Sequence, residues 1–421
     1  MNSDQRGYGR NWVRLLKEKR TIHLILIILL LASLSIWTIG IFKEGTTGSQ
    51  FGLFFLKGQN FLADFTNVVG YSAELNPYYS AYYSGAGEKA YPPLSYLIMY
   101  PFSRLVHIND YFERNYFLDM YQEPLLLIMY ILTVAVVMIA VYETVRHRTS
   151  GNRWMKILTG FAIVLCGPMI YSVERGNQIM LAMLMVMVFL FNYDSREIKK
   201  RVVASFCLAI AASLKIMPAL AGILLITDKK YWKDAFRTVI IGLMVFIVPF
   251  FFLKCGPLKG IYHLYLNITY NIEAYSGIHG CTLASCLQCI GVDVSGAWRT
   301  VLTIMTGILL LVGCAILPKK WERATAVCLM IIMLPGHSED YNVLYLIPAL
   351  ILFLNEEEHA LTDWLIVLGF LILFQHVQFH NSPIFADHRF GLLCLLTVLL
   401  VRCVKGYICL WSGLASRKAK T

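Results

Sequence analysis

Long apolar runs dominate the pattern of this chain. The first run, Ile22–Phe42, is about 20 residues long, the length that an α-helix needs to cross a bilayer. Further apolar runs are Pro124–Val145, Lys156–Tyr171, Ile179–Tyr193, Val239–Lys254, Val301–Leu317, Ala324–Leu334, Val343–Leu354, Trp364–Gln375 and Phe390–Val404. The pattern predicts an all-α, polytopic membrane protein with about 10–13 transmembrane helices.

Short basic clusters between the runs predict the orientation of the chain. The clusters are Arg6–Arg20, Arg146–Lys156, Arg196–Arg201, Lys229–Arg237 and Lys319–Arg323. Lysine and arginine concentrate in cytoplasmic segments, and one topology puts every cluster on that side. We therefore expect a multi-pass protein of the plasma or inner membrane with both termini and the tail 405–421 in the cytoplasm. Two large extracytoplasmic loops are expected at 43–123 and 255–298.

Two apolar segments are too short to cross directly. Pro93–Val106 is about 14 residues long, which predicts a half-inserted helix within the first loop. Val202–Thr227 has to hold two crossings between basic clusters, so it predicts a broken or re-entrant pair with Lys215 and Pro218 near its middle. Because irregular backbone is prohibitive in lipid, that turn is expected to pack against protein or to line a cavity.

The composition agrees with a single membrane domain over residues 1–421. Hydrophobic residues make up 57% of the chain and charged residues 15%, with a mean hydropathy of +0.60. Soluble domains carry about a quarter of their residues as charged types, so a soluble enzyme is excluded. The net charge of +11 comes from the clusters between apolar runs, which favours contact with lipid headgroups and not with nucleic acid.

The first candidate for chemistry is Asp64 in the first outer loop. It is flanked by Ala63 and Phe65, so its carboxylate is expected near the membrane surface, where it can act as a general base. The alternative is a helix N-cap or a hydrogen-bonded loop residue. Tyr91, at the end of a tyrosine-rich stretch, is a candidate for sugar stacking or for an interfacial aromatic belt.

A polar turn and a lysine within an apolar run add candidate ligands. In the outer turn after Glu174, Arg175 is suited to bidentate phosphate binding, and Asn177 and Gln178 to sugar hydroxyls. The alternative is a polar cap on a helical hairpin. Lys215 costs about 3 kcal/mol inside an apolar run unless it pairs or snorkels, so it is a functional candidate.

A third cluster lies in the turn that begins at Pro335. Its polar residues are His337, Ser338, Glu339 and Asp340, followed by Tyr341, and they predict a wall of the same outer site or, alternatively, an ordinary solvated turn. In such a wall His337 is a further candidate cation for a phosphate, and Glu339, Asp340 and Tyr341 are candidate contacts of the sugar or the acceptor. The loop residues His279, Cys281, Cys286 and Cys289 match no common zinc spacing, so a disulfide is favoured over a metal site. No cofactor is expected, and a divalent metal remains an open alternative.

Several short motifs together resemble a known superfamily. They are the early Asp64, the segment Tyr91–Leu94, the turn Gly176–Gln178, the pair Lys215 and Pro218, and the spacing from Pro335 to Tyr341. This arrangement resembles the GT-C superfamily of membrane glycosyltransferases. It is most similar to glycosyltransferase family 87, which includes mannosyltransferases that use polyprenyl-phosphate-mannose.

The resemblance implies a GT-C-like architecture and an inverting hexosyltransferase. Its donor would be a polyprenyl-phosphate sugar, and its acceptor a lipid or glycan at the extracytoplasmic side. Asp64 falls at the position of the catalytic base, and Lys215 at that of a lysine beside the donor phosphate. The chain departs from the family where Asp340 replaces a common histidine before Tyr341, while His337 lies three residues earlier.

Two other classes of function fit the pattern of membrane spans. A polymerase or ligase of surface polysaccharide also spans the membrane many times and uses lipid-linked sugars. A transporter tends to show inverted repeats and charges near the bilayer midplane. The sequence has no evident repeat, and its polar clusters fall on one side, which favours the transferase.

Overall fold

The computed structural model describes residues 18–44, 61–78, 89–113, 117–275, 280–376 and 387–418. Every named element in these residues is a helix, and an isolated bridge between Glu18 and Glu358 is the only strand-like pairing among them. The expected all-α, polytopic architecture is confirmed. Most of the first basic cluster, at residues 1–17, lies outside the described residues.

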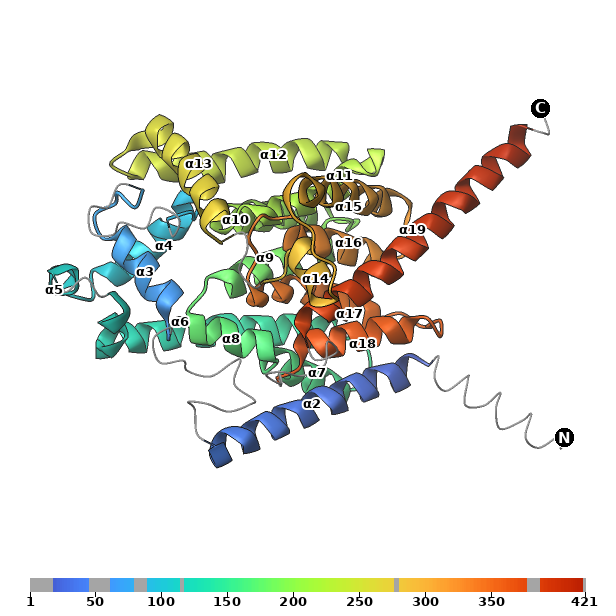
Figure 1. Cartoon of the computed structure of the whole chain (residues 1–421), viewed down its shortest axis with the longest axis horizontal. Helices are drawn as coiled ribbons and strands as arrows, with labels where there is room; N and C mark the ends of the chain where they lie inside the picture. The colour runs from blue at the N-terminus through green and yellow to red at the C-terminus, as the bar shows by residue number, and fades with distance from the viewer. Residues whose placement is uncertain are drawn as a thin grey trace.

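Five helices in the described part of the chain are long and apolar enough to cross a membrane. They are α2 (Lys19–Glu44), α6 (Pro124–Arg148), α12 (Trp232–Ile247) with its flanking 3-10 turns η4 (Lys229–Tyr231) and η5 (Val248–Phe252), α15 (Gly296–Ile316) and α19 (His388–Lys418). A sixth span is formed if α7 (Arg153–Val164) and α8 (Gly167–Arg175), bent by 43°, cross as one. Figure 1 shows α2 and α12 running along the long axis on opposite sides of the view.

Shorter helices fill the interior between these spans. They are α9 (Ile179–Asn192), α10 (Ile198–Leu214), η3 (Met217–Gly222) with α11 (Ile223–Ile226), α16 (Lys320–Met333), η6 (Asp340–Leu346) with α17 (Ile347–Leu354), and α18 (Asp363–Phe374). Most residues of α9, α16 and α17 are buried. The expected 10–13 crossings are reached only if such short helices are counted too. Apolar sequence alone does not distinguish a helix packed inside protein from one that faces lipid.

The described parts of the two expected outer loops are largely helical. The first contains α3 (Ala63–Ser72), α4 (Pro93–Ser103), α5 (Ile108–Glu113) and η2 (Phe117–Gln122), and the second contains α13 (Gly256–Tyr275) and α14 (Leu283–Cys289). Helix α4 corresponds to the expected half-inserted helix, and it begins at Pro93, where proline is favoured because no backbone N–H is needed. Helices α3, α4 and α5 lie at the left-hand end of the molecule in Figure 1.

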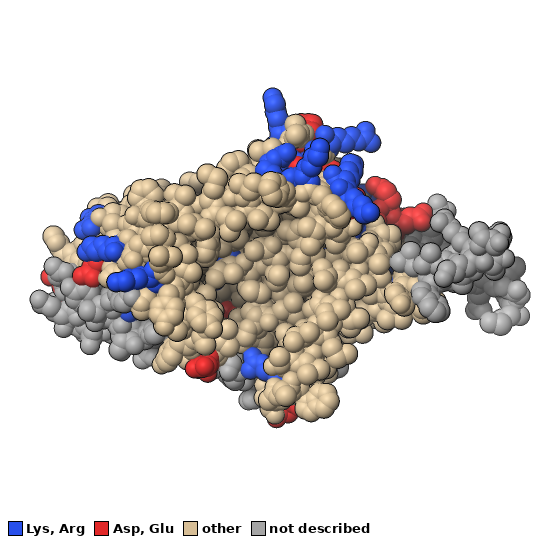
Figure 2. Space-filling model, turned by 90° about the horizontal axis from the view of Figure 1, so that it is seen from above, with Lys and Arg blue, Asp and Glu red and all other residues tan. Residues whose placement is uncertain are grey.

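Charged residues are unevenly distributed over the surface. On the face shown in Figure 2, lysine, arginine, aspartate and glutamate gather in patches near the rim, around a broad uncharged area. Exposed apolar side chains of the candidate spans include Ile139 of α6, Leu243 of α12 and Ile304 of α15. Such a surface is stable against lipid and not against water, as expected for a multi-pass membrane protein.

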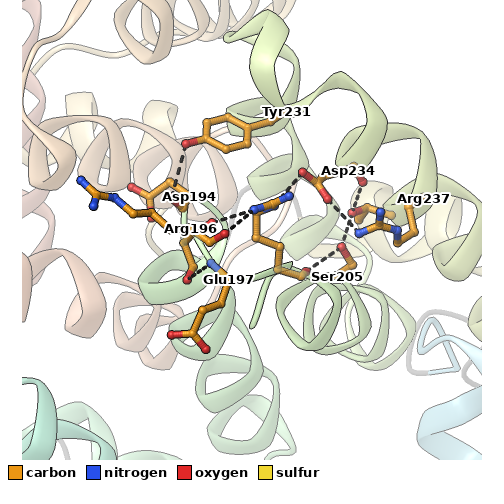
Figure 3. Close-up of polar contacts among 10 residues, drawn as sticks. Asp194, Arg196, Glu197, Ser205, Tyr231, Asp234 and Arg237 are labelled. Atoms are coloured by element: carbon orange, nitrogen blue, oxygen red, sulfur yellow. Dashed lines mark hydrogen bonds and ion pairs between the residues drawn. The ribbon is translucent and has the colours of Figure 1, made fainter. Parts of the chain in front are cut away.

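A buried aspartate joins α10 to α12. Asp234 is 3% exposed, and its carboxylate accepts hydrogen bonds from Arg201 Nε at 2.9 Å and from Arg237 Nη1 at 2.8 Å. Beside it, the Thr238 hydroxyl donates to the Ser205 hydroxyl at 2.7 Å, and Figure 3 shows Asp234, Arg237 and Ser205 together at this helix contact. The two arginines balance the charge that burial of the carboxylate would otherwise make costly.

Replacing this aspartate is expected to weaken the α10–α12 contact. Asp234→Ala removes two charge-assisted hydrogen bonds, each of which contributes roughly 1.5–3 kcal/mol. We expect a clearly lower melting temperature of the detergent-solubilised protein, measured by the loss of the monodisperse species on heating. Glu197→Ala, which removes an exposed pair with Lys200, is the control and should cost less than about 1 kcal/mol. Equal melting temperatures for the two variants would contradict the prediction.

Candidate active site

A pocket of about 430 Å³ lies where the segments of the predicted site meet. Seven of the ten candidate residues line it: Asp64, Tyr91, Arg175, Lys215, His337, Glu339 and Tyr341. They come from α3, the approach to α4, the end of α8, the bend after α10, and the segment from the 335 turn into η6. The volume falls within the range of pockets that hold small ligands. The structure therefore brings into one cavity residues that are far apart in the sequence.

Asp64 lies in the first turn of α3 with both carboxylate oxygens engaged. Arg175 Nη2 donates to Oδ1 at 2.6 Å, and Asn177 Nδ2 donates to Oδ2 at 2.6 Å. The side chain is 13% exposed, and it faces the pocket. Each carboxylate oxygen accepts more than one hydrogen bond, so Asp64 can still accept a proton or a hydroxyl donor from a ligand.

The start of α3 is held against the end of α8 by the backbone. Leu62 adopts a left-handed conformation with φ of 53°, which costs about 1–2 kcal/mol for a residue with a side chain. Its N–H donates to the carbonyl of Glu174 at 2.7 Å, and its side chain is 1% exposed. These contacts stabilise the strained residue and fix the position of Asp64 two residues later.

Gly176 ends α8 where only a glycine fits. Its φ of +71° is the left-handed conformation that commonly closes a helix, and a Cβ there would lie 2.5 Å from Cβ of Phe65. Gly176→Ala is therefore expected to displace α3 and Asp64 with it. We predict a protein that is still inserted in the membrane but has lost roughly tenfold or more of its activity, because a displacement of a candidate base by about 1 Å can cost that much.

The measurement is the catalytic rate of purified Gly176→Ala, and Gly242→Ala serves as the matched control. Gly242 lies in the middle of α12, and a Cβ there meets no atom within 4 Å. The control should retain the wild-type rate. A wild-type rate in Gly176→Ala would show that the contact with Phe65 is not needed for the position of Asp64.

Lys215 lies at the bend between α10 and η3, outside the candidate spans. Pro218 follows in the first turn of η3. The carbonyl of Leu214 has no partner within α10 because it lies at the end of the helix, and it accepts a hydrogen bond from Ser95 Oγ at 2.8 Å. The ammonium lies 5.3 Å from the ring centroid of Tyr91 and 5.0 Å from that of Tyr341. Two aromatic faces thus hold the cation in the pocket wall.

The charge of Lys215 is available to a ligand. Among the described residues it forms no ion pair with a carboxylate, although Asp64 and Glu339 line the same pocket. Burial lowers the pKa of Lys215 to about 8, while attraction to Asp64 and Glu339 works in the opposite direction. A cation with this environment is suited to an anionic ligand such as a phosphate group.

The segment after Pro335 and α13 supply further parts of the pocket lining. His337 Nε2 lies 3.2 Å from Glu339 Oε1, and the ring of Tyr341 packs against that of Tyr171 at 5.9 Å. Ser338 of the predicted turn also lines the pocket, and so do three asparagines that were not predicted from the sequence: Asn67, Asn271 and Asn342. Neutral polar residues on a helix or in a turn carry no signal that separates them from ordinary surface positions.

Three candidate residues lie outside the pocket wall. Asn177 is 2% exposed and bonds to Asp64, and Gln178 Nε2 donates to the carbonyl of Ser95 at 3.2 Å. Asp340 Oδ1 accepts a hydrogen bond from the thiol of Cys281, with Sγ at 3.5 Å. Their polar groups thus face neighbouring protein segments, whereas the sequence assigned all three to sugar or acceptor binding.

The cysteines of the segment 280–289 are free thiols. Cys281, Cys286 and Cys289 form no disulfide in the structure, and His279 lies outside the described residues. Within the part of the chain that the structure describes, no group of three or more His, Cys, Asp or Glu side chains is arranged to hold a metal ion. The nearby Asn267, in a glycosylation triplet, is 6% exposed and donates to the carbonyl of Lys89, so its amide is not accessible.

Comparison with known proteins identifies the family. A family model described as glycosyltransferase family 87 matches residues 90–335, more than half of the chain. No curated protein and no solved structure matches. The matched segment includes Tyr91, Arg175 and Lys215, whereas Asp64 and His337 lie outside it. With its apolar helices, the chain is a membrane glycosyltransferase, and it belongs to glycosyltransferase family 87.

Proposed function

We propose that the protein transfers a hexose, mannose-like in structure, from a polyprenyl-phosphate donor to a lipid or glycan acceptor. The observation that carries the proposal is that Asp64 and Lys215 line the same pocket, together with Arg175, which donates a hydrogen bond to Asp64 Oδ1. A general base and cations for an anionic leaving group are the groups that this reaction needs. A membrane pocket with both is suited to a donor that carries sugar and phosphate on a lipid.

The proposed chemistry is a single displacement with inversion at the anomeric carbon. Asp64 accepts the proton of the acceptor hydroxyl while the oxygen attacks that carbon. The bond to the phosphate oxygen breaks, and the polyprenyl phosphate leaves with its negative charge stabilised by Lys215 and by the remaining donors of Arg175. Phosphate is already a good leaving group, so the reaction needs no general acid and no cofactor.

Aromatic and polar residues around the cations supply a surface for the sugar. Tyr91 and Tyr341 present ring faces beside Lys215, and Glu339 with its partner His337 lies on the same wall. Carbohydrates are bound by hydrogen bonds to charged and amide groups and by packing of their C–H faces on aromatic rings. These four residues are therefore the proposed contacts of the donor sugar or the acceptor.

The reaction is proposed to take place at the extracytoplasmic side of the plasma or inner membrane. Helix α3, which carries Asp64, lies at the left-hand end in Figure 1, and the basic cluster Lys229–Arg237 lies at the start of α12, toward the opposite end. The preference of basic clusters for the cytoplasm then orients the site outward, with both termini inside.

The proposal is tested with purified protein in lipid nanodiscs. A panel of polyprenyl-phosphate sugars and nucleotide sugars is supplied together with membrane lipids and glycans as acceptors. The expected result is consumption of a polyprenyl-phosphate hexose, release of polyprenyl phosphate and formation of a product with inverted anomeric configuration. Consumption of a nucleotide sugar alone, or retention of configuration, would overturn the proposal.

A further inference from the structure

The side-chain amide of Asn177 has all its hydrogen-bonding groups engaged within the protein. Its Oδ1 accepts from the backbone N–H of Ile179 at 2.9 Å. Its Nδ2 donates to Asp64 Oδ2 at 2.6 Å and to the hydroxyl of Tyr91 at 3.2 Å. An amide nitrogen has two hydrogens, so both are used. With 2% of its surface exposed, Asn177 has neither a free donor nor an open face for a sugar.

The backbone around Asn177 is as closely held as its side chain. Its N–H donates to the carbonyl of Ser172 at 3.1 Å, in the turn that closes α8. The preceding Gly176 has the left-handed conformation, and the following Ile179 begins α9 and is fully buried. The amide is therefore fixed to the junction of two helices, which is a rigid base from which to orient another side chain.

Resting on the proposed function, we infer that Asn177 is a positioning residue for the base and not a contact of the sugar. Its amide holds Asp64 Oδ2 and the hydroxyl of Tyr91 in one arrangement, so it fixes the direction in which the carboxylate faces the pocket. Arg175 bonds only the other oxygen, Oδ1, and a single contact leaves the carboxylate free to rotate. Catalysis depends on this orientation because a base has to lie within hydrogen-bond reach of the proton that it accepts.

Two variants of Asn177 distinguish a role in orienting Asp64 from a role in binding the donor sugar. Asn177→Ala removes the donor, and Asn177→Asp keeps the shape and the acceptor for Ile179 but places an oxygen opposite the carboxylate of Asp64. For both we expect kcat to fall about 10–100-fold while the dissociation constant of the polyprenyl-phosphate sugar stays within about twofold of wild type. A residue that binds the sugar would weaken donor binding instead.

Asn192→Ala is the matched control for loss of structure. The amide of Asn192 is also satisfied within the protein, since Nδ2 donates to the carbonyl of Val188 at 2.7 Å and Oδ1 accepts from Arg148 at 2.7 Å. It lies at the other end of α9, away from the pocket wall. This control is expected to lose thermal stability to a similar degree as Asn177→Ala and to keep the wild-type kcat.

The outcomes distinguish this inference from the proposed function. If wild type turns over the donor but Asn177→Asp has the wild-type kcat, or if donor binding weakens with kcat unchanged, the positioning role is wrong and the transferase survives. If Asn177→Ala does not fold, the kcat and donor dissociation constant of Asn177→Asp alone test the positioning role. If wild type itself consumes no polyprenyl-phosphate sugar, the proposed function fails, and the positioning role fails with it.

Discussion

Asp64→Asn is expected to lower the rate of sugar transfer by about three orders of magnitude. The substitution keeps the size of the side chain but removes its ability to accept a proton, and general base catalysis contributes roughly 10²–10⁴-fold. The new amide group is a donor where Asp64 has an acceptor, so it faces either Arg175 Nη2 or Asn177 Nδ2, which are donors too. One hydrogen bond is lost, and a modest loss of stability accompanies the loss of rate.

The measurement is single-turnover release of polyprenyl phosphate from bound donor, which separates chemistry from binding. Asp293→Asn is the control, because Asp293 is an exposed carboxylate outside the pocket wall. It should react at the wild-type rate. A polysaccharide polymerase or ligase that acts through residues later in the chain would tolerate Asp64→Asn. Retention of activity in that variant would therefore favour this alternative over the proposed mechanism.

Lys215→Ala is expected to lower kcat/KM by about 10²–10³-fold. The lysine is the cation held between Tyr91 and Tyr341, and removal of one group that stabilises developing negative charge typically costs this much. The donor should bind more weakly as well, since its phosphate is charged in the ground state. Lys254→Ala, at a lysine outside the pocket wall, is the control and should leave both values unchanged.

The dependence on pH gives a second readout for Lys215. Its pKa is lowered to about 8 by burial, so the ammonium loses its proton as the pH rises through that value. In wild type kcat/KM, which reports on the free enzyme, should decline above about pH 8. Lys215→Arg keeps a positive charge at all such pH values and should lack that decline, even if its rate is lower. The same decline in both proteins would contradict a role for the lysine charge.

The location of the site is largely predictable from the sequence. Lys215 within an apolar run and Asp64 beside Phe65 are costly near lipid unless a cavity receives them, and both line the pocket. The broken helix that carries the lysine follows from the length between two basic clusters. These arguments use only the cost of charge and of irregular backbone in a bilayer, so they need no knowledge of the fold.

Which polar residues contact a ligand, and which bond to other parts of the protein, cannot be predicted in this way. From the sequence Asn177 and Gln178 are equally suited to bind a sugar, yet both amides bond to other parts of the chain. Whether a polar turn residue faces a ligand or the protein depends on which distant segment packs against it. The same rule applies to Asn67, Asn271 and Asn342, which lie on α3, α13 and η6 and line one pocket only because these distant segments meet there.

The pairing of Asp64 with Asn177 has a consequence for biogenesis. The two residues are 113 positions apart, and Asp64 and Arg175 are 111 apart, so the carboxylate emerges from the ribosome long before either partner. Insertion of α2 and α6 precedes that of α8 and α9, and contacts of such long range form only after the intervening chain is placed. A nascent chain that ends before residue 175 therefore carries Asp64 without its two hydrogen-bond donors. The hydrogen bonds of Asp64 are therefore completed late in synthesis, and they depend on the assembled helices and not on α3 alone.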